Sequence, residues 1–173
     1  NILTELCDIE SQTHFQLLID ECKKNNFIQY EISNFGKKGY FSVHNKNYWM
    51  GQEYLGIGPS AHSFNGKIRR WNISNNTKYI DHLKNDIISF EEEKLKYSDK
   101  FNEYIMTSLR TIWGIDLNTL KKKFGDEIYT NFSLQIKKWI KSKHLYTEKN
   151  KIFLTTKGKY ISDTIASDFF IIN

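Results

Sequence analysis

The chain has 173 residues, of which 39% are hydrophobic and 15% aromatic, and a net charge of +5. A chain of this length and aromatic content can bury a hydrophobic core, which excludes general disorder. The longest strongly apolar run is Phe169 to Ile172, far short of the roughly 18 residues of a membrane-spanning helix. We therefore expect a folded chain that does not cross a bilayer.

The N-terminus and the cysteines indicate the origin of the chain. The first ten residues lack both an initiating Met and the order of a signal peptide, so we expect the sequence to start inside a longer protein or to be trimmed. Cys7 and Cys22 are the only cysteines, and their spacing matches no zinc, cluster or CxxC motif. This favours a reducing, cytoplasmic compartment.

Positive charge is concentrated in one segment. Residues 121–159 contain eleven Lys and three acidic residues, a local excess of eight positive charges. Such a segment is either a solvated, lysine-rich helix face or a surface for phosphate, anionic lipid or nucleic acid. The solvated face is the favoured interpretation, because exposed helices are commonly rich in lysine.

The N-terminal half predicts alternating helices and strands. Phe15, Leu18, Ile19 and Cys22 recur at helical spacing behind possible caps at Ser11 and Thr13. Strands are expected at 27–32 and 54–58, an extended segment at 67–73, and a further helix after the turn at 74–76. A helix followed closely by a strand indicates an α/β unit. Gly56 and Gly58 allow a backbone or a ligand to approach closely.

The C-terminal half, after the acidic run at 91–93, predicts mainly helices. One helix is capped by Ser98 and carries Phe101, Ile105, Leu109 and Ile112 on one face, with Gly114 as its end. Two more are expected on either side of Gly125, then strands at 145–148 and 152–155 and a last helix capped by Thr156. Helix, helix, hairpin and helix in this order are typical of a winged-helix module.

The most unusual segment is HNKNYW at residues 44–49. In a helical turn His44 and Tyr48 share a face, as do Asn45 and Trp49. A neutral imidazole is a good axial ligand for haem iron, and aromatic rings offer flat apolar faces to the macrocycle. Arg69 and Arg70 offer guanidinium groups for the propionates. A lone loop histidine is more often a surface or capping residue, so spacing alone leaves both readings open.

Three segments in order carry a family resemblance: YEISNF at 30–35, HNKNYW at 44–49 and YLGIGPSAHS at 54–63. Together they resemble the HemW heme chaperones, a family of the oxygen-independent coproporphyrinogen III oxidase-like radical SAM proteins. Weaker matches continue through residues 70–79, 109–117 and 154–158. The resemblance implies that His44 ligates haem iron and that Asn45, Tyr48 and Trp49 belong to the same haem-binding motif.

The resemblance also implies a fold and a division of the chain. It predicts an α/β (α+β) fragment in which residues 1–90 are the last helix and strands of an incomplete radical SAM (β/α)6 barrel. Residues 91–173 would form the mostly helical, winged-helix-like domain. Gly56 and Gly58 would border the S-adenosylmethionine side of the barrel. The family's CxxxCxxC motif, which holds a [4Fe–4S] cluster in the full-length proteins, is absent from this sequence, so we expect no catalytic residues in it.

The function implied by the resemblance is to receive haem and deliver it to membrane-associated acceptor proteins, in the cytoplasm or at the inner face of the membrane. One alternative is a part of a true oxygen-independent coproporphyrinogen III oxidase, which the HNKNYW segment argues against. Another is nucleic-acid binding through Lys137, Lys138, Lys141 and Lys143, which the lack of a base-reading Arg in that helix disfavours. Exposed barrel edges predict pairing between two copies.

Overall fold

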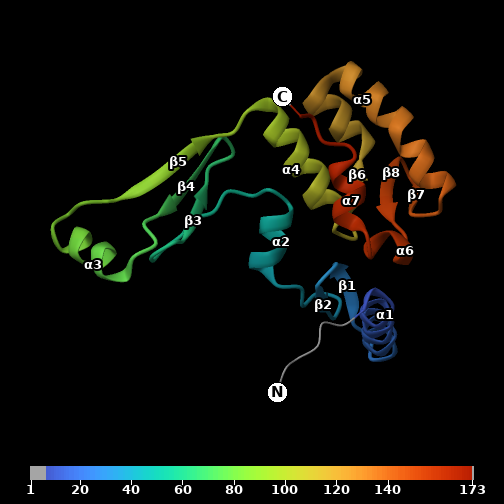
Figure 1. The fold of residues 1–173 in the computed structure, drawn as a ribbon, viewed down its shortest axis with the longest axis horizontal. Helices are drawn as coiled ribbons and strands as arrows, with labels where there is room; N and C mark the ends of the chain where they lie inside the picture. The colour runs from blue at the N-terminus through green and yellow to red at the C-terminus, as the bar shows by residue number, and fades with distance from the viewer. Residues whose placement is uncertain (1–6, 173) are drawn as a thin grey trace.

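The structure is a computed structural model that describes residues 7–172. This part of the chain begins with a helix and a short hairpin (Figure 1). Helix α1 is followed by the antiparallel strands β1 and β2, with bounds Asp8–Lys24, Ile28–Glu31 and Asn34–Gly36. The predicted helix and the predicted strand at 27–32 are confirmed, whereas the sequence pattern misses β2. Residues 1–6, which open the predicted domain 1–90, lie outside the described residues.

Helix α1 begins three residues before the predicted caps. The Glu10 carboxylate accepts the backbone N–H of Cys7 at 3.1 Å and so closes the first turn. Its apolar face is only half covered, because Phe15 and Ile19 are half-buried and Leu18 stays exposed. The Phe15 ring contacts Tyr160 near the C-terminus at a centroid distance of 5.4 Å. This contact joins the two ends of the described chain.

The predicted strand at 54–58 is wrong. Only Tyr54 pairs there, in an isolated bridge with Phe64. Beyond it the backbone of Gly56 runs so close to His62 that a Cβ at Gly56 would lie 2.1 Å from the His62 carbonyl oxygen. Gly58 has a φ of 107°, which extended pairing does not allow. The expectation that Gly56 permits the close approach of another backbone is therefore confirmed, while the strand itself is replaced by an irregular segment.

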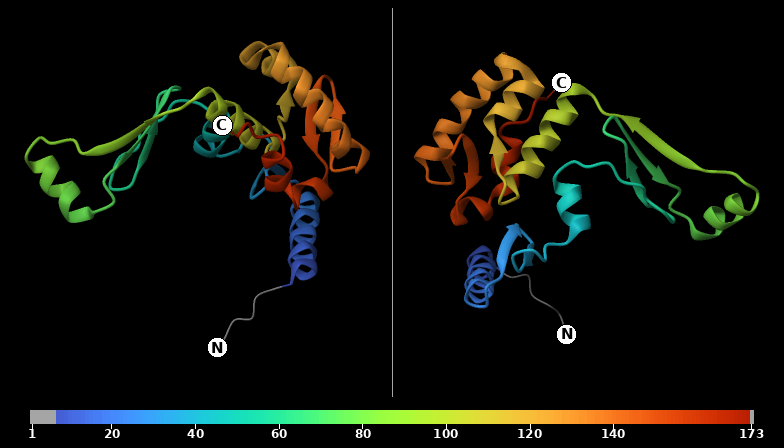
Figure 2. Two further views of the ribbon diagram at one scale, coloured as in Figure 1. Left: turned by 45° about the horizontal axis from the view of Figure 1, so that its top comes forward. Right: turned by 180° about the vertical axis from the view of Figure 1, so that it is seen from behind.

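An elongated arm follows, in which a three-stranded antiparallel sheet carries a helix at its far end (Figures 1 and 2). The sheet order is β3-β4-β5, and α3 lies between β4 and β5 in the chain; the bounds are His62–Phe64, Ile68–Asn72, Asn76–Lys84 and Phe90–Lys94. The extended segment at 67–73 and the helix after the 74–76 turn are confirmed. Asn75 caps this helix by accepting the backbone N–H of Lys78.

Strand β5 is absent from the sequence prediction, because its acidic run has the composition of a solvated loop. The register explains why it pairs nevertheless. Residues 91–93 lie opposite Trp71, Arg70 and Arg69 of β4, and each Glu bonds the side chain across from it. Cross-strand pairs of opposite charge stabilise an antiparallel sheet. The charge run is therefore a paired strand, in which Glu91 and Glu93 lie on one face of the sheet and Glu92 lies on the other.

The remaining elements form a helical region around a second three-stranded sheet, of order β6-β8-β7. The elements are α4 (Tyr97–Leu109), β6 (Ile115–Asp116), α5 (Leu117–Lys141), β7 (Leu145–Glu148), β8 (Lys151–Leu154), α6 (Thr156–Lys159) and α7 (Ser162–Ser167). Both predicted strands are confirmed. Helix α5 contains the predicted break, since Gly125 has φ 82° and ψ 174° inside it. The predicted last helix is two short helices, and Thr155 rather than Thr156 caps the first.

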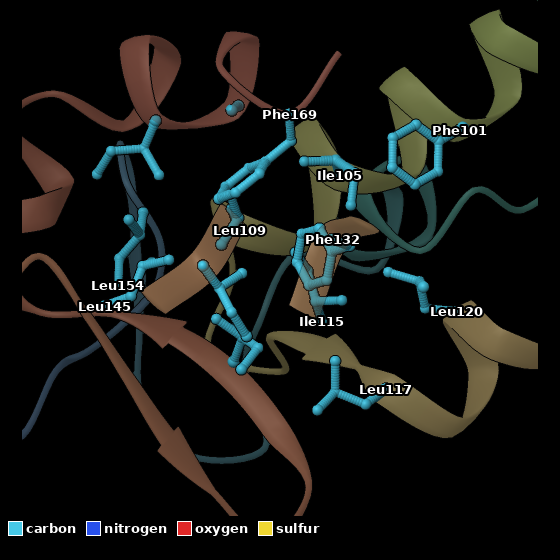
Figure 3. Packing of buried hydrophobic residues seen from close by; sticks show 14 of the residues in the cluster. Phe101, Ile105, Leu109, Ile115, Leu117, Leu120, Phe132, Leu145, Leu154 and Phe169 are labelled. Carbon is cyan, nitrogen blue, oxygen red and sulfur yellow. The ribbon is translucent and has the colours of Figure 1, made fainter. Parts of the chain in front are cut away.

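The hydrophobic core lies in this helical region (Figure 3). Phe101, Ile105 and Leu109 of α4 are at most 2% exposed and pack with residues from α5, the sheet and α7. Complete burial of such side chains stabilises the fold by roughly 1.5–3 kcal/mol each. Ile32, just after β1, joins the same core. The barrel remnant, the winged-helix assignment and the pairing between copies stay predictions.

Candidate functional site

The HNKNYW segment forms a complete short helix, α2 (Val43–Trp49). Ser42 caps it, because the Ser42 Oγ accepts the backbone N–H of Asn45 at 3.3 Å. Gly51 ends it with a φ of 65°, and the Gln52 N–H returns to the carbonyl of Asn47 at 3.0 Å. The sequence is compatible with a loop or a single helical turn here, and the structure has a seven-residue helix. Helix α2 lies between the N-terminal hairpin and the sheet arm (Figure 1).

One face of α2 points into the protein. Phe41, Asn45 and Trp49 are half-buried, whereas the residues between them are exposed. Phe41 stacks on the Tyr30 ring at 4.5 Å, and the Asn45 amide donates to Asn34 Oδ1 at 2.8 Å. The half-buried residues are four positions apart, so they lie on one side of the helix, which is its inner face.

The inner face ends at a buried charge network. Glu31 is 1% exposed and accepts hydrogen bonds from Arg110 Nε at 3.0 Å, from the Asn34 amide at 2.6 Å and from the Ser33 N–H at 3.0 Å. Arg110 also donates through Nη1 to Asp163 at 2.8 Å, and its guanidinium carbon lies 5.3 Å from the centroid of the Trp49 ring. A buried carboxylate needs such partners, because its desolvation is costly.

The neighbouring face of α2, which carries His44 and Tyr48, is open to solvent. His44 is exposed, and within residues 7–172 its ring makes no hydrogen bond to the protein. Tyr48 is 47% exposed and its ring lies 5.2 Å from Trp49 and 5.9 Å from Tyr54. Val43, 71% exposed, adds an apolar side chain beside them. The arrangement leaves an imidazole and a phenol, one helical turn apart on α2, exposed and available to a ligand.

The structure places Arg69 and Arg70 on β4, in ion pairs with carboxylates. Arg69 contacts Glu103 at 2.5 Å and Glu93 at 3.1 Å, and Arg70 contacts Glu92 at 3.1 Å. Their role toward haem propionates stays a prediction. Arg69 approaches α2 through Tyr54, the phenol that contacts Tyr48. Burial raises the pKa of Tyr54, and the nearby Arg69 opposes this increase.

Gly56 lies in a cleft of about 460 Å³ between α3 and the arm sheet. Its lining is mostly apolar, with Tyr54, Tyr79, His82 and Arg70 as its larger polar members. Gly58 is close by, since its N–H donates to the Tyr79 hydroxyl at 3.2 Å. The predicted S-adenosylmethionine side of these glycines stays a prediction.

Three of the lysines predicted as a possible nucleic-acid surface lie in the second half of α5, and the fourth, Lys143, follows the C-cap of that helix. Lys138 is paired with Asp168 at 2.6 Å, while Lys137, Lys141 and Lys143 are exposed. Residues 7–172 contain no group of three or more His, Cys, Asp or Glu able to hold a metal ion. Nor does the described chain contain a helix long and apolar enough to span a membrane.

Sequence reasoning missed Glu31, Asn34 and Arg110 as parts of the site. The first two lie in the YEISNF segment and Arg110 in the weaker match at 109–117, so the resemblance marked all three without giving them a role. Their roles follow only from the fold, because Arg110 and Glu31 are 79 residues apart in the sequence.

Comparisons with known proteins agree with this resemblance. The heme chaperone HemW of Lactococcus lactis is 29% identical over 157 residues, 91% of this chain, and that of Buchnera aphidicola (subsp. Schizaphis graminum) is 33% identical over 90% of it. The chain spans about two fifths of the length of these relatives, 41% and 42%. No family model matches the sequence.

Among solved structures, the chain is similar to the coproporphyrinogen III oxidase HemN of Escherichia coli, a radical SAM enzyme, with a TM-score of 0.66. The likeness covers 90% of this chain and 39% of that one, at 15% identity, and concerns the fold alone. The chain is therefore a homologue of the HemW heme chaperones and corresponds to the C-terminal part of their sequences.

Proposed function

We propose that this chain binds haem through His44 and serves the receipt and delivery of haem. The observation that carries the proposal is the division of α2 into two faces. Asn45 and Trp49 are used to hold the helix, whereas His44 is exposed and makes no hydrogen bond within the described residues. An imidazole nitrogen free of internal partners is available as a metal ligand.

The residues on the outer face fit a tetrapyrrole. Haem, when bound, supplies an iron with an axial position for an imidazole nitrogen. His44 would fill that position, and Tyr48 would offer a ring face one helical turn away. Tyr48 is held by Trp49 and Tyr54, so its ring is presented at small cost in side-chain entropy. Asn45 and Trp49 act indirectly, by fixing the helix.

The wider function belongs to the proposal as well. The relatives that match nine tenths of the chain are named heme chaperones, and the likeness to the oxidase is one of fold. We infer that the full-length protein also holds a [4Fe–4S] cluster and S-adenosylmethionine outside this chain. Acceptor proteins at the inner face of the membrane would take the haem, with the protein itself in the cytoplasm.

A haem titration of the chain tests the proposal. His44→Ala is expected to lose or shift the Soret band of the haem-loaded protein, because the axial nitrogen is gone. His14→Ala is the matched control, since His14 is also an exposed helical histidine, and it is expected to titrate like the unaltered chain. The same Soret band and affinity in all three proteins would reassign the ligand.

A further inference from the structure

The guanidinium of Arg110 is the meeting point of three parts of the chain. Its Nε donates to Glu31 at the end of β1, its Nη1 donates to Asp163 on α7, and its plane lies near the Trp49 ring at the end of α2. Arg110 itself is the C-cap residue of α4. A single side chain therefore links α2 to the helical region that holds the hydrophobic core.

We propose that Arg110, held by Glu31 and Asp163, is a positioning residue for His44. The inference rests on the proposed function and concerns the geometry behind the ligand. With Trp49 held at one end of α2 and Asn45 bonded to Asn34 at its middle, the helix cannot roll about its axis. The face that carries His44 and Tyr48 then keeps one direction.

The choice of arginine at this position has a physical reason. A guanidinium is planar and always charged, so it can donate in its plane to two carboxylates while one face lies on an aromatic ring. A lysine ammonium is a point charge and lacks both the fork and the flat face. Glu31 requires a countercharge because it is buried. Lysine can meet that requirement, but it leaves Trp49 without its contact.

The Glu31 side of the network reaches α2 by a second route. Glu31 accepts from the Asn34 amide at 2.6 Å, and Asn34 accepts from Asn45 at 2.8 Å. Arg110, Glu31, Asn34, Asn45 and Trp49 therefore form a closed ring of contacts that begins and ends on α2. Residues that orient a metal-ligating side chain from behind typically change metal affinity by 10-fold to 100-fold when they are mutated.

The test uses Arg110→Lys in the chain and two measurements. Backbone NMR order parameters of residues 43–49, without haem, report whether α2 is held. We expect a decrease from the rigid value of about 0.85 toward about 0.6. A haem titration reports the effect on the ligand, and we expect binding about 10-fold weaker with a shifted Soret band. A double variant, Glu31→Gln with Arg110→Met, removes both charges together and should give the same two changes if Arg110→Lys fails to fold.

Lys138→Met is the matched control. Lys138 also pairs with an Asp near α7, at 2.6 Å, and its Nζ lies 5.6 Å from the ring of Trp139, but within residues 7–172 it makes no ion pair or ring contact with α2. It should leave both measurements unchanged. Unchanged order parameters of α2 in Arg110→Lys would overturn the inference. The inference would also be overturned if Arg110→Lys made α2 mobile but left haem binding unaltered, while His44→Ala abolished haem binding. If His44→Ala binds haem normally, the proposed function fails, and the order parameters alone decide whether Arg110 holds α2.

Discussion

The ring of Phe41 stacks on the ring of Tyr30, with centroids 4.5 Å apart and planes inclined by 23°. Tyr30 lies in β1 and is 2% exposed, while Phe41 stands just before the cap of α2. The contact fixes where α2 leaves the hairpin. It is the first of the three contacts, with those of Asn45 and Trp49, that turn one face of the helix inward.

Removal of this contact should destabilise the packing of the segment before α2 against β1. Phe41→Ala is expected to lower the free energy of unfolding by about 1–2 kcal/mol, below the ~3–5 kcal/mol of a fully buried Phe because Phe41 is half-buried. Urea denaturation measures this value. Tyr40→Ala serves as the control, since Tyr40 is 83% exposed, and should stay within about 0.5 kcal/mol of the unaltered chain. Equal effects of the two substitutions would contradict the stacking argument.

The core of the helical region makes a stronger prediction. Ile105 has 0% exposure and lies in the middle of α4. Ile105→Ala should cost about 2–5 kcal/mol, because it removes buried carbon atoms and leaves a cavity. Met106, the next residue, is 37% exposed, and Met106→Ala should lower the free energy of unfolding by at most about 1 kcal/mol. Thermal or urea unfolding compares the two, and a smaller loss for Ile105→Ala would mean that α4 is wrongly oriented.

Gly56 tests the irregular segment that replaces the predicted strand. A Cβ at this position would lie 2.1 Å from the His62 carbonyl oxygen and 2.8 Å from the Ala61 carbonyl carbon. Gly56→Ala should therefore force the backbone apart and increase hydrogen exchange across β3 and β4. Leu55→Ala is the control, because Leu55 is 81% exposed. If Gly56→Ala exchanges like the unaltered arm, the close approach of these two segments is wrong.

The start of α5 predicts a pH dependence. The Asp116 carboxylate accepts the Thr119 N–H at 2.7 Å, and this backbone hydrogen bond lowers the pKa of Asp116 below its ordinary value of 3.8. A carboxyl whose pKa is lower in the folded state contributes stability that is present above the ordinary pKa. That stability is lost as the pH falls from about 4 toward the lower native pKa.

Asp116→Asn isolates the charge, because asparagine can still cap a helix. The variant should lose the part of the acid dependence that Asp116 carries, seen as a flatter unfolding free energy between about pH 5 and pH 2. If the unfolding free energy depends equally steeply on pH in the unaltered chain and in Asp116→Asn, the lowered pKa of Asp116 is contradicted.

Periodicity predicted most of the helical region because the deciding contacts there are local. Phe101, Ile105 and Leu109 recur at four-residue spacing and are buried as expected. Ile112, assigned to the same face, is 41% exposed because α4 ends at Leu109. The short strands β2 and β6 were missed, since two or three residues carry no period. Strand β5 was missed because only its partner strand explains its charges.

The candidate site was predicted in part. The spacing in HNKNYW correctly pairs His44 with Tyr48 and Asn45 with Trp49 on two faces of one helix. The spacing does not tell which pair faces inward, because that depends on contacts with distant residues. Asn34, the partner of Asn45, lies 11 residues before it, and Arg110, the partner of Glu31, lies 79 residues after that residue. The sequence therefore predicts which residues share a face of the helix, but only the tertiary contacts determine which face is exposed.

Pulsed electron paramagnetic resonance can detect whether the His44 imidazole ligates the haem iron. The chain is labelled with ¹⁵N only in its histidine rings and loaded with ferric haem. We expect a ¹⁵N hyperfine coupling to the iron in the unaltered chain and in His14→Ala, and none in His44→Ala. A coupling that persists in His44→Ala would contradict ligation by His44.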